Sequence, residues 1–412
     1  MKKTIKNKKV VLAFSGGLDT SFCAKYLTKD KGMEVYSAVV NTGGFSPEEL
    51  TAIAERAKKL GVKSHETLER TQDYYQNILR YLIYGNVLKN NTYPLSVSAE
   101  RIFQAIALAE YALNIGADAI AHGSTGAGND QVRFDLVFQL IAPELKIITP
   151  IRDLQLTREQ EVAYLAKHGM NMDWQKAKYS INKGLWGTSI GGAETLTSHL
   201  TLPEEAYPSQ LSKTNPSSIN IIFEKGEITG INGDKLPPVD AINLLEKIAS
   251  QYAIGRDIHV GDTIIGIKGR VGFEAAAATI IIKAHHLLEK HVLSKWQQHW
   301  KQQLAEWYGM FIHEGQYFEP VMRNIESFLE DTQERVSGTV FVELHPYRLV
   351  LKGVESPYDL LQSDFGQYGE MNNRWSGEDV KGFTKILANP VLISRGVKKR
   401  SAAIEGIEVH RR

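Results

Sequence analysis

Short apolar runs alternate with amphipathic stretches over the first 150 residues. The runs at 9–14, 33–40, 117–123 and 145–150 are brief and rich in β-branched residues, which is typical of buried parallel strands. Helical patterns separate them: one ends before Gly32, and the others cover about 47–60, 98–113 and 130–140. For 47–60, Ser46 is the expected N-cap, Pro47 opens the helix and Gly61 ends it. The alternation predicts an α/β fold with a doubly wound parallel sheet.

The pattern changes after Pro150. A helix at 157–167 leads into YSINKGLWGTSIGG, which reads as a Gly- and Ser-containing loop at a domain junction. Short strands near 219–233 and 262–273, long helices at 276–308 and 320–330, and a hairpin at 338–352 predict an α+β second domain. The tail after 390 is too polar to form a core and is expected to be disordered or an arm packed on another subunit. The expected parts are therefore 1–170, 171–389 and 390–412.

Composition limits the class of protein. The 412 residues are too many for one ordinary core, and 43% hydrophobic with 23% charged residues indicates a globular chain. A net charge of +1 lacks the basic excess of a dedicated nucleic-acid binder. The single cysteine, Cys23, excludes an internal disulfide and fits a reducing cytoplasm. No apolar run approaches the roughly 20 residues that span a bilayer, so we expect no membrane association.

The stretch FSGGLDTS, residues 14–21, follows the first predicted strand and opens a helix. Backbone N–H groups and the positive helix end would then face an anion, with Gly16 and Gly17 permitting close approach. The lysine of γ-phosphoryl-transfer loops is absent, while a carboxylate, Asp19, is present. The stretch resembles the SGGxDS loop of N-type ATP pyrophosphatases, which implies cleavage between the α- and β-phosphates. Asp19 would then act as a helix cap or through Mg²⁺.

The segment AHGSTGAGNDQVRFD, residues 121–135, follows the third predicted strand. Asn129 and Arg133 lie at i and i+4 on one helix face, and Asp130 stands beside them. Donors for carboxylates and an acceptor for an ammonium are what an amino-acid ligand requires. Both glycine-rich loops follow strands of a parallel sheet, so we expect them at the same edge.

These two segments resemble those of the argininosuccinate synthases, and similarity continues through IGRDIHVGDTIIGIKGRVGFE, KAHHLLEK and VESPYDLL over nearly the whole chain. The resemblance implies an adenine nucleotide-binding domain, a synthetase domain and a C-terminal oligomerisation arm, commonly in a homotetramer. It implies that citrulline, aspartate and ATP, with Mg²⁺, give argininosuccinate, AMP and pyrophosphate.

The resemblance also assigns residues. Catalytic roles fall on Asp19, Asp130 and Arg133. The nucleotide-binding positions are Ala13, Phe14, Ser15, Gly16, Gly17, Leu18, Asp19, Thr20, Ser21, Val40, Gly123, Thr125 and Asn182. The positions for the two amino-acid substrates are Tyr93, Ser98, Thr125, Asn129, Asp130, Arg133, Ser180, Ser189, Asp262 and Phe273. No resident metal site is expected from the residues.

Two departures from the family stand out. Gly261 and Phe273 occupy positions where many members have a Glu and a Tyr that contact citrulline. Either Asp262 or Glu274 supplies a replacement contact, or the substrate is a citrulline whose α-amine is acylated. Asn182 also replaces a common Asp near ATP.

Two other classes of function share the first loop. A tRNA-modifying pyrophosphatase would need reactive cysteines and a basic surface, and a non-catalytic nucleotide sensor would not need GNDQVRF.

Overall fold

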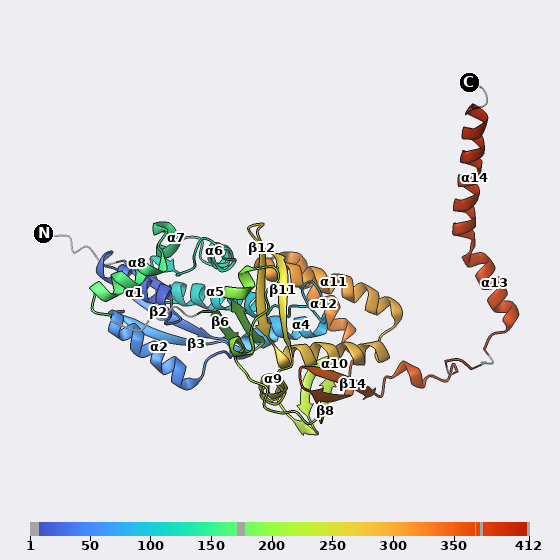
Figure 1. Ribbon diagram of the computed structural model, residues 1–412, viewed down its shortest axis with the longest axis horizontal. Coiled ribbons are helices and arrows are strands. Elements are labelled where there is room, and N and C mark those ends of the chain that lie inside the picture. The colour runs from blue at the N-terminus through green and yellow to red at the C-terminus, as the bar shows by residue number, and fades with distance from the viewer. Residues whose placement is uncertain (1–7, 171–177, 367, 371–373, 410–412) are drawn as a thin grey trace. The chain divides into compact units, whose positions relative to one another are not determined.

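The computed structural model describes residues 8–170, 178–366, 368–370 and 374–409 (Figure 1). The chain forms two compact units, one up to Tyr358 and one from Asp359 onward, which are described separately below. The three-part division expected from the sequence stays a prediction. Its junction at residue 171 and the last three residues of the expected arm lie outside the described residues.

A parallel sheet in the order β3-β2-β1-β4-β5 forms the nucleotide-binding part. Its strands are β1 (Lys9–Ala13), β2 (Glu34–Asn41), β3 (Ser64–Glu69), β4 (Ala119–Ala121) and β5 (Lys146–Ile148). The central strand β1 pairs with β2 and β4 on its two sides. Alternate residues of β1 enter different cores: Val10 and Leu12 pack on one face and Val11 on the other. The doubly wound sheet is thereby confirmed, although β3 was not predicted and β4 is shorter than expected.

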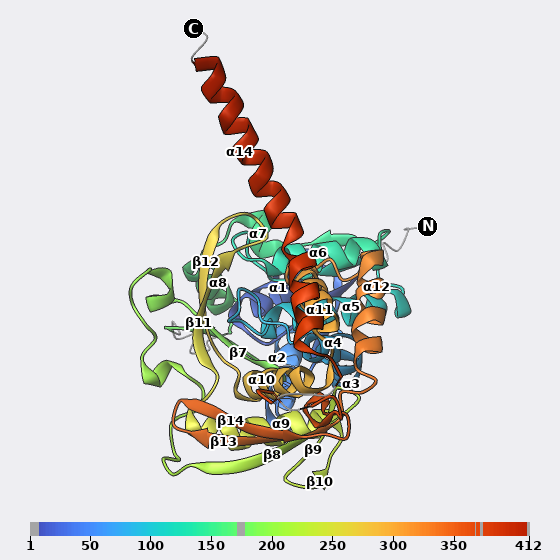
Figure 2. The same ribbon diagram turned by 90° about the vertical axis from the view of Figure 1, so that its right-hand side faces the viewer.

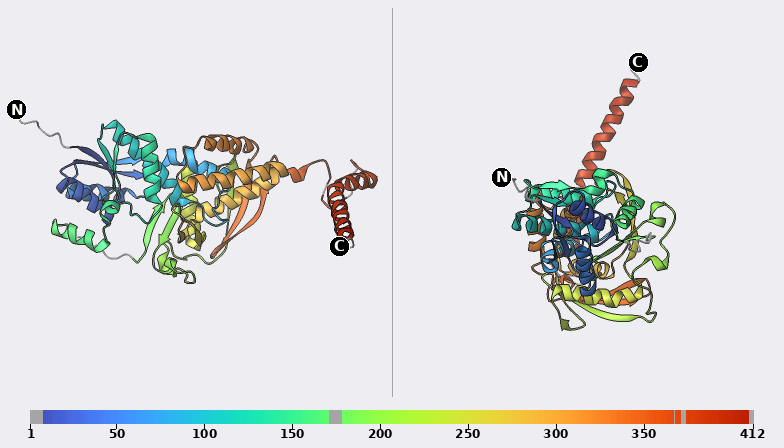
Figure 3. Two further views of the ribbon diagram at one scale, coloured as in Figure 1. Left: turned by 90° about the horizontal axis from the view of Figure 1, so that it is seen from above. Right: turned by 90° about the vertical axis from the view of Figure 1, so that its left-hand side faces the viewer.

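Helices cover both faces of this sheet, as Figure 3 shows from above. On one face lie α1 (Leu18–Lys29), α2 (Pro47–Leu60) and α8 (Arg158–Lys167), and on the other α5 (Ser96–Asn114) and α6 (Asp130–Ile141). The short helix α7 (Pro150–Leu154) contacts α1. The predicted limits of α2 are confirmed: Ser46 accepts a hydrogen bond from the backbone N–H of Glu49 at 3.2 Å, and Gly61 takes a left-handed conformation with φ +87°.

A helical stretch missed by the sequence patterns joins the two halves of the first unit. It consists of α3 (Thr71–Tyr74), a π-helical turn (Tyr75–Leu79) and α4 (Arg80–Tyr84). Although it belongs to the N-terminal half of the chain, α4 packs against α10 (Ala276–Val292) and α12 (Pro320–Thr332) of the other half. This packing explains why the residues up to Tyr358 form one compact unit.

A four-stranded antiparallel sheet in the order β11-β12-β7-β6 faces the parallel sheet. Its strands are β6 (Ser180–Gly184), β7 (Gly187–Gly191), β11 (Arg256–Asp262) and β12 (Lys268–Glu274). The prediction of a loop at 179–192 is wrong, because this segment is the β6–β7 hairpin. Its glycines reflect close packing rather than looseness: a Cβ on Gly187 would lie 2.6 Å from that of Ala275.

A second antiparallel sheet, in the order β10-β9-β8-β13-β14, closes the far end of the unit (Figure 2). Its strands are β8 (Ser217–Glu224), β9 (Glu227–Ile231), β10 (Asp234–Lys235), β13 (Gly338–His345) and β14 (Arg348–Glu355). Helix α9 (Pro238–Ala249) packs on β9, and α10 (Ala276–Val292) packs on β13 and β14. The hairpin predicted at 338–352 is confirmed.

The single helix predicted at 276–308 is wrong. The chain breaks after α10, and α11 (Lys295–Glu314) begins at the N-cap Ser294, whose side chain accepts from the N–H of Gln297. A serine at this position accepts hydrogen bonds from the free N–H groups at the start of a new helix. The chain therefore forms two helices here, although the apolar pattern continues across Ser294. Helix α12 (Pro320–Thr332) follows. Short 3₁₀ turns occur at Ala193–Leu196, Glu204–Ala206, Ser250–Tyr252 and Leu360–Gln362.

The second unit contains α13 (Gly377–Leu387) and α14 (Asn389–Val409). None of the side chains described from residue 360 onward is buried. Large apolar side chains such as Phe383, Ile386 and Ile393 are therefore exposed in a single chain. Within the described part of the chain, no helix is long and apolar enough to cross a membrane.

A buried ion pair fixes α11 against α10. The Lys301 ammonium lies 2.8 Å from the Glu289 carboxylate, both side chains are at most 4% exposed, and Lys301 also donates to the carbonyl of Tyr84 at 2.6 Å. Replacing Lys301 by Met leaves a buried, unpaired carboxylate and should lower the free energy of unfolding by roughly 3–5 kcal/mol. Urea denaturation measures this.

The double variant Lys301→Met/Glu289→Leu is the control, since it removes both charges and should recover part of the loss. A Lys301→Met protein within about 1 kcal/mol of the parent would contradict the assigned role of the pair.

Candidate active site

A cleft of about 1140 Å³ opens at the carboxyl edge of the parallel sheet. Both glycine-rich loops line it, together with the start of α6, part of α5 and the hairpins β6–β7 and β11–β12. The expected common edge of the two loops is thereby confirmed. Residues singled out from the sequence that line this cleft are Ala13, Phe14, Ser15, Gly17, Leu18, Asp19, Thr20, Val40, Tyr93, Ser98, Gly123, Thr125, Asn129, Asp130, Arg133, Ser180, Asn182, Ser189 and Asp262. Gly16, Ser21 and Phe273 lie outside its wall.

The first loop presents the start of α1 to the cleft. Gly16 has φ +76°, and its carbonyl accepts a hydrogen bond from the Arg56 guanidinium. Gly17 is the N-cap of α1, so no side chain caps the helix there. The N–H groups of the first turn therefore remain available for an anion, which the helix dipole favours.

The two loops are in direct contact. A Cβ on Gly123 would lie 3.3 Å from the carbonyl carbon of Asp19 and from the amide nitrogen of Thr20. Any side chain at residue 123 would press on the first turn of α1. A ligand held by the first loop is therefore within reach of groups on the second.

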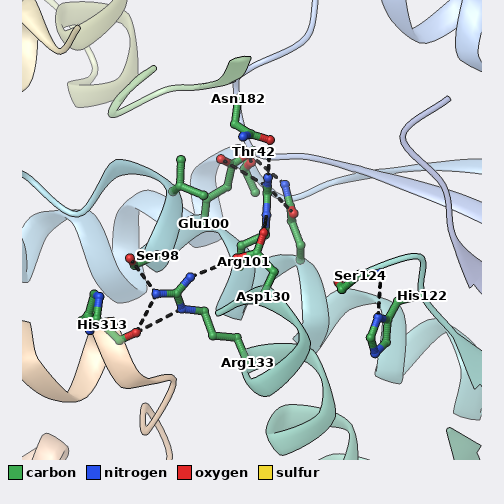
Figure 4. Close-up of polar contacts among 12 residues, drawn as sticks. Thr42, Ser98, Glu100, Arg101, His122, Ser124, Asp130, Arg133, Asn182 and His313 are labelled. Carbon is green, nitrogen blue, oxygen red and sulfur yellow. Dashed lines mark hydrogen bonds and ion pairs between the residues drawn. The ribbon is translucent and has the colours of Figure 1, made fainter. Parts of the chain in front are cut away.

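A buried histidine fixes the second loop. The Nδ1 atom of His122 accepts from the N–H of Ser124 at 3.2 Å, as Figure 4 shows, and its Nε2 lies 2.9 Å from the Asp135 carboxylate. Arg152 holds Asp135 from the other side at 2.8 Å. Because Nδ1 accepts, Nε2 is the nitrogen that donates to Asp135. These contacts define the path of the loop as it leaves β4.

Asp130 lies between two guanidinium groups. Arg101 and Arg133 each contact one of its carboxylate oxygens at 3.0 Å (Figure 4). Burial opposes the charge on Asp130, but the two arginines outweigh it and hold the pKa of this carboxyl below its usual value. Asp130 is therefore an anion at neutral pH.

The same arginines reach other elements of the cleft. Arg101 donates to the side-chain oxygen of Asn182 on β6 at 2.8 Å. Arg133 donates to the Ser98 hydroxyl on α5 at 3.0 Å and to the backbone carbonyl of His313 on α11 at 2.8 Å. One ionic network thus connects α5, α6, β6 and α11.

Asn129 connects the second loop to the β11–β12 hairpin. Its side-chain oxygen accepts from the N–H of Ile264, at the turn of that hairpin, at 2.9 Å. The hairpin therefore covers the cleft beside the start of α6. This contact links residues 135 positions apart in the chain.

Tyr93 packs in an aromatic cluster at the cleft wall. Its ring lies 5.2 Å from that of His259 and 5.4 Å from that of Phe273, between centroids. Phe273 is 2% exposed and serves as packing behind Tyr93. Of the two replacement contacts considered above, Asp262 lines the cleft, whereas Glu274 lies outside its wall, bound to Arg256 at 2.8 Å.

Sequence reasoning missed Arg101, Glu100, His259 and His313, all of which line the cleft. Arg101 could have been found from Ser98, because residues three apart on a helix share a face. Glu100 is buried and accepts from Thr42 at 2.5 Å and from Gln104 at 2.8 Å; burial raises the pKa of its carboxyl. The two histidines come from distant segments, and no local pattern indicates them.

Comparison with known protein families identifies the family of this chain. Residues 9–171 match the model described as the arginosuccinate synthase N-terminal HUP domain, and residues 179–393 match that of the arginosuccinate synthase C-terminal domain. The chain belongs to the argininosuccinate synthase family.

Curated members of the argininosuccinate synthase family are similar over most of the chain. The argininosuccinate synthase of Methanocaldococcus jannaschii is 38% identical over 363 residues, which cover 87% of this chain and 91% of that protein. That of Dictyoglomus thermophilum is 36% identical, covering 93% and 96%, and that of Xylella fastidiosa is 35% identical, covering 92% and 95%. The cleft is lined by residues from both matched family domains.

A protonated carboxyl supports the first loop of this family member. Glu161 on α8 is 3% exposed; burial, followed by the charge of Asp19 and a hydrogen bond to it, raises the pKa of Glu161 to about 8. An acid whose pKa is higher in the folded than in the unfolded chain stabilises the fold at low pH. Between pH 5 and 8 the unfolding free energy should therefore fall with rising pH by on the order of 3 kcal/mol from this group.

The Glu161→Gln variant isolates this contribution, since glutamine does not titrate while other groups stay the same. Denaturant unfolding at pH 5, 6.5 and 8 should show a steeper decline for the parent than for the variant. Parallel pH profiles would contradict the assignment.

Proposed function

We propose that this protein ligates citrulline and aspartate with ATP, giving argininosuccinate, AMP and pyrophosphate. The observation that carries the proposal is the contact between the two loops inside one cleft, at Gly123 and Asp19. An anion-binding helix start and an amino-acid-binding helix start then face the same ligand space. Membership of the argininosuccinate synthase family supports the same reaction.

The first step uses the first loop. The ureido oxygen of citrulline attacks the α-phosphorus of ATP, the bond to the β-phosphate breaks, and pyrophosphate leaves. The N–H groups at the start of α1, without a side-chain cap, would hold this leaving group. Val40 on β2 would contact the adenine from the neighbouring strand, and Gly123 and Asn182 would complete the nucleotide site.

The second step uses the second loop. The aspartate amine attacks the ureido carbon, and AMP leaves with the former ureido oxygen. The aspartate nitrogen enters as an ammonium, releases two protons to water and keeps one in the guanidinium product. Asp130 would accept from the aspartate ammonium, while Thr125 and Asn129 would bind its carboxylates. Arg133 with Tyr93, Ser98, Ser180 and Ser189 would hold citrulline. Catalysis would come mainly from placing the reactants and neutralising phosphate charge.

Mg²⁺ is part of this proposal. Among the described residues, no group of three or more His, Cys, Asp or Glu side chains gathers to hold a metal. The only carboxylate of the first loop is Asp19. The phosphates of ATP would therefore supply most oxygens around the ion, with Asp19 as the nearest protein carboxylate. Bound in this way, Mg²⁺ would neutralise charge on the phosphates.

A biosynthetic role in the cytoplasm suits this reaction. ATP is abundant there, and the single cysteine needs no oxidising compartment.

Asp130 provides the test of the mechanism. Wild-type protein should release pyrophosphate from ATP only when citrulline (or its acylated form) and aspartate are both present. Asp130→Ala should lose at least about 1000-fold in turnover, because a charge paired with two arginines and facing the amine disappears. A pyrophosphate-release assay measures both.

Near-normal turnover of Asp130→Ala, at unchanged thermal stability, would refute its role. Pyrophosphate release that depends on tRNA instead of the amino acids would refute the proposed function.

We infer that the chain forms a homo-oligomer, with a tetramer as the expected state. The support is the exposed apolar face of α13, which includes Val380, Phe383 and Leu387 and which a second copy of the chain would cover. A double variant, Phe383→Glu with Ile386→Glu, should reduce the mass measured by light scattering. Lys385→Glu on the same helix is the matched control. A monomeric parent, or an unchanged mass in the double variant, would contradict the inference.

A further inference from the structure

One region of the cleft wall has an unusual charge environment for an amino-acid site. It consists of Tyr93, Ser98, His259, Gly261, Asp262 and His313, called the histidine corner below. Gly261 lies in this corner and Phe273 packs on Tyr93 behind it, and these are the two positions at which the chain departs from the citrulline contacts of its family. We therefore assign the α-carbon end of the ureido substrate to this corner. The free amino acid citrulline would bring an α-ammonium group here, which requires an anion or several acceptors.

His259 takes the space that a side chain at residue 261 would need. A Cβ on Gly261 would lie 2.6 Å from His259 Nε2 and 3.3 Å from Asn90 Nδ2. Glycine at 261 therefore accommodates the imidazole, and β11 presents no carboxylate at this position. The corner is filled by a neutral ring where a carboxylate, the counter-ion of an ammonium, could stand.

Burial and nearby cations keep the two histidines of the corner uncharged. Burial, followed by the charges of Arg133, Lys89 and His259, lowers the pKa of His313 to about 3. Burial and Lys89 also lower the pKa of His259. Both imidazoles are therefore neutral at pH 7, and neither would gain from a further cation nearby.

The acid of the corner is already paired. Asp262 contacts the Lys268 ammonium at 2.6 Å, and its side chain is 69% exposed, so water screens its charge. Asp130, the next acid along the wall, is held by two arginines. An α-ammonium in the corner would have no buried, unpaired carboxylate among the described residues.

His259 also offers an unused hydrogen-bonding atom. Its side chain is 6% exposed, and its Nδ1 has no hydrogen-bond partner among the described residues. A buried nitrogen without a hydrogen-bond partner destabilises the fold unless a ligand supplies that partner. With the proton on Nδ1 it would donate to a carbonyl or carboxylate oxygen, and with the proton on Nε2 it would accept from an N–H, so the oxygen and the N–H of an amide serve the two tautomers in turn.

We propose that the ureido substrate carries an acylated α-nitrogen, so that an uncharged amide with its acyl oxygens, and no ammonium, occupies the histidine corner. This proposal rests on the ligase function proposed above and specifies the class of its substrate. An amide removes the positive charge and supplies the oxygen acceptor that His259 lacks.

A comparison of three ureido substrates, each assayed separately, tests this proposal directly. The parent protein is assayed for pyrophosphate release with ATP, aspartate and, in turn, citrulline, N-acetylcitrulline or N-succinylcitrulline. We expect at least one acylated form to exceed citrulline by tenfold or more in kcat/KM. A kcat/KM for citrulline equal to or above that of both acylated forms overturns this proposal alone. Absence of release with all three overturns the ligase function itself.

A charge variant provides an independent test. Gly261→Glu introduces a carboxylate into the corner and should move the preference at least tenfold toward citrulline. Gly261→Gln introduces a side chain of the same size without the charge and is the control. When both variants fold, Gly261→Gln should leave the ratio of kcat/KM for the preferred acylated substrate to kcat/KM for citrulline within threefold of the parent's ratio. Equal changes of this ratio in the two variants would contradict the electrostatic argument. If neither variant folds, the substrate preference of the parent protein alone decides whether the proposal of an acylated substrate holds.

Discussion

The Asp130 carboxylate, held between Arg101 and Arg133 at 3.0 Å each, is the interaction on which the site depends. The Asp130 side chain is 36% exposed, whereas those of Arg101 and Arg133 are 15% and 4% exposed, so without Asp130 two largely desolvated cations would share one site with no anion between them. Each arginine also donates hydrogen bonds to another element. Arg101 donates to Asn182, and Arg133 donates to Ser98 and to the backbone carbonyl of His313. One charge therefore sets the relative positions of four segments that are far apart in the sequence.

The cleft follows from this arrangement. Helix α5 packs against β1 and β2 on one side and against β6, β7 and α11 on the other, so the nucleotide-binding sheet and the hairpins share one support. The two glycine-rich loops meet because Gly123 has no side chain to separate them from the first turn of α1. The uncapped start of α1 and the Asp130 carboxylate thus line one cleft, as the proposed adenylation followed by amine attack would require. The histidine corner selects among ureido substrates and leaves the arrangement of the two loops and Asp130 unchanged.

Sequence patterns predicted the elements whose signals are local. Strand β1, the capped helix α2 and the loops around Gly16 and Gly123 are fixed by residues within a few positions of each other. The β6–β7 hairpin was missed because its glycines serve contacts with a distant residue, Ala275. The break before α11 was missed because apolar residues continue through Ser294. His259 was missed for another reason: the residues around it come from other segments, and only the folded chain brings them together. For Arg101, the spacing from Ser98 held a local signal that was overlooked.

The central claim is that one cleft holds the departing diphosphate and the attacking amino acid at the same time. A crystal structure of the protein with a non-hydrolysable ATP analogue and aspartate tests it most directly. We expect the terminal phosphates at the N–H groups that open α1, with the aspartate amine facing the carboxylate between Arg101 and Arg133. A nucleotide bound outside this cleft, or an aspartate bound away from Thr125 and Asp130, would contradict it.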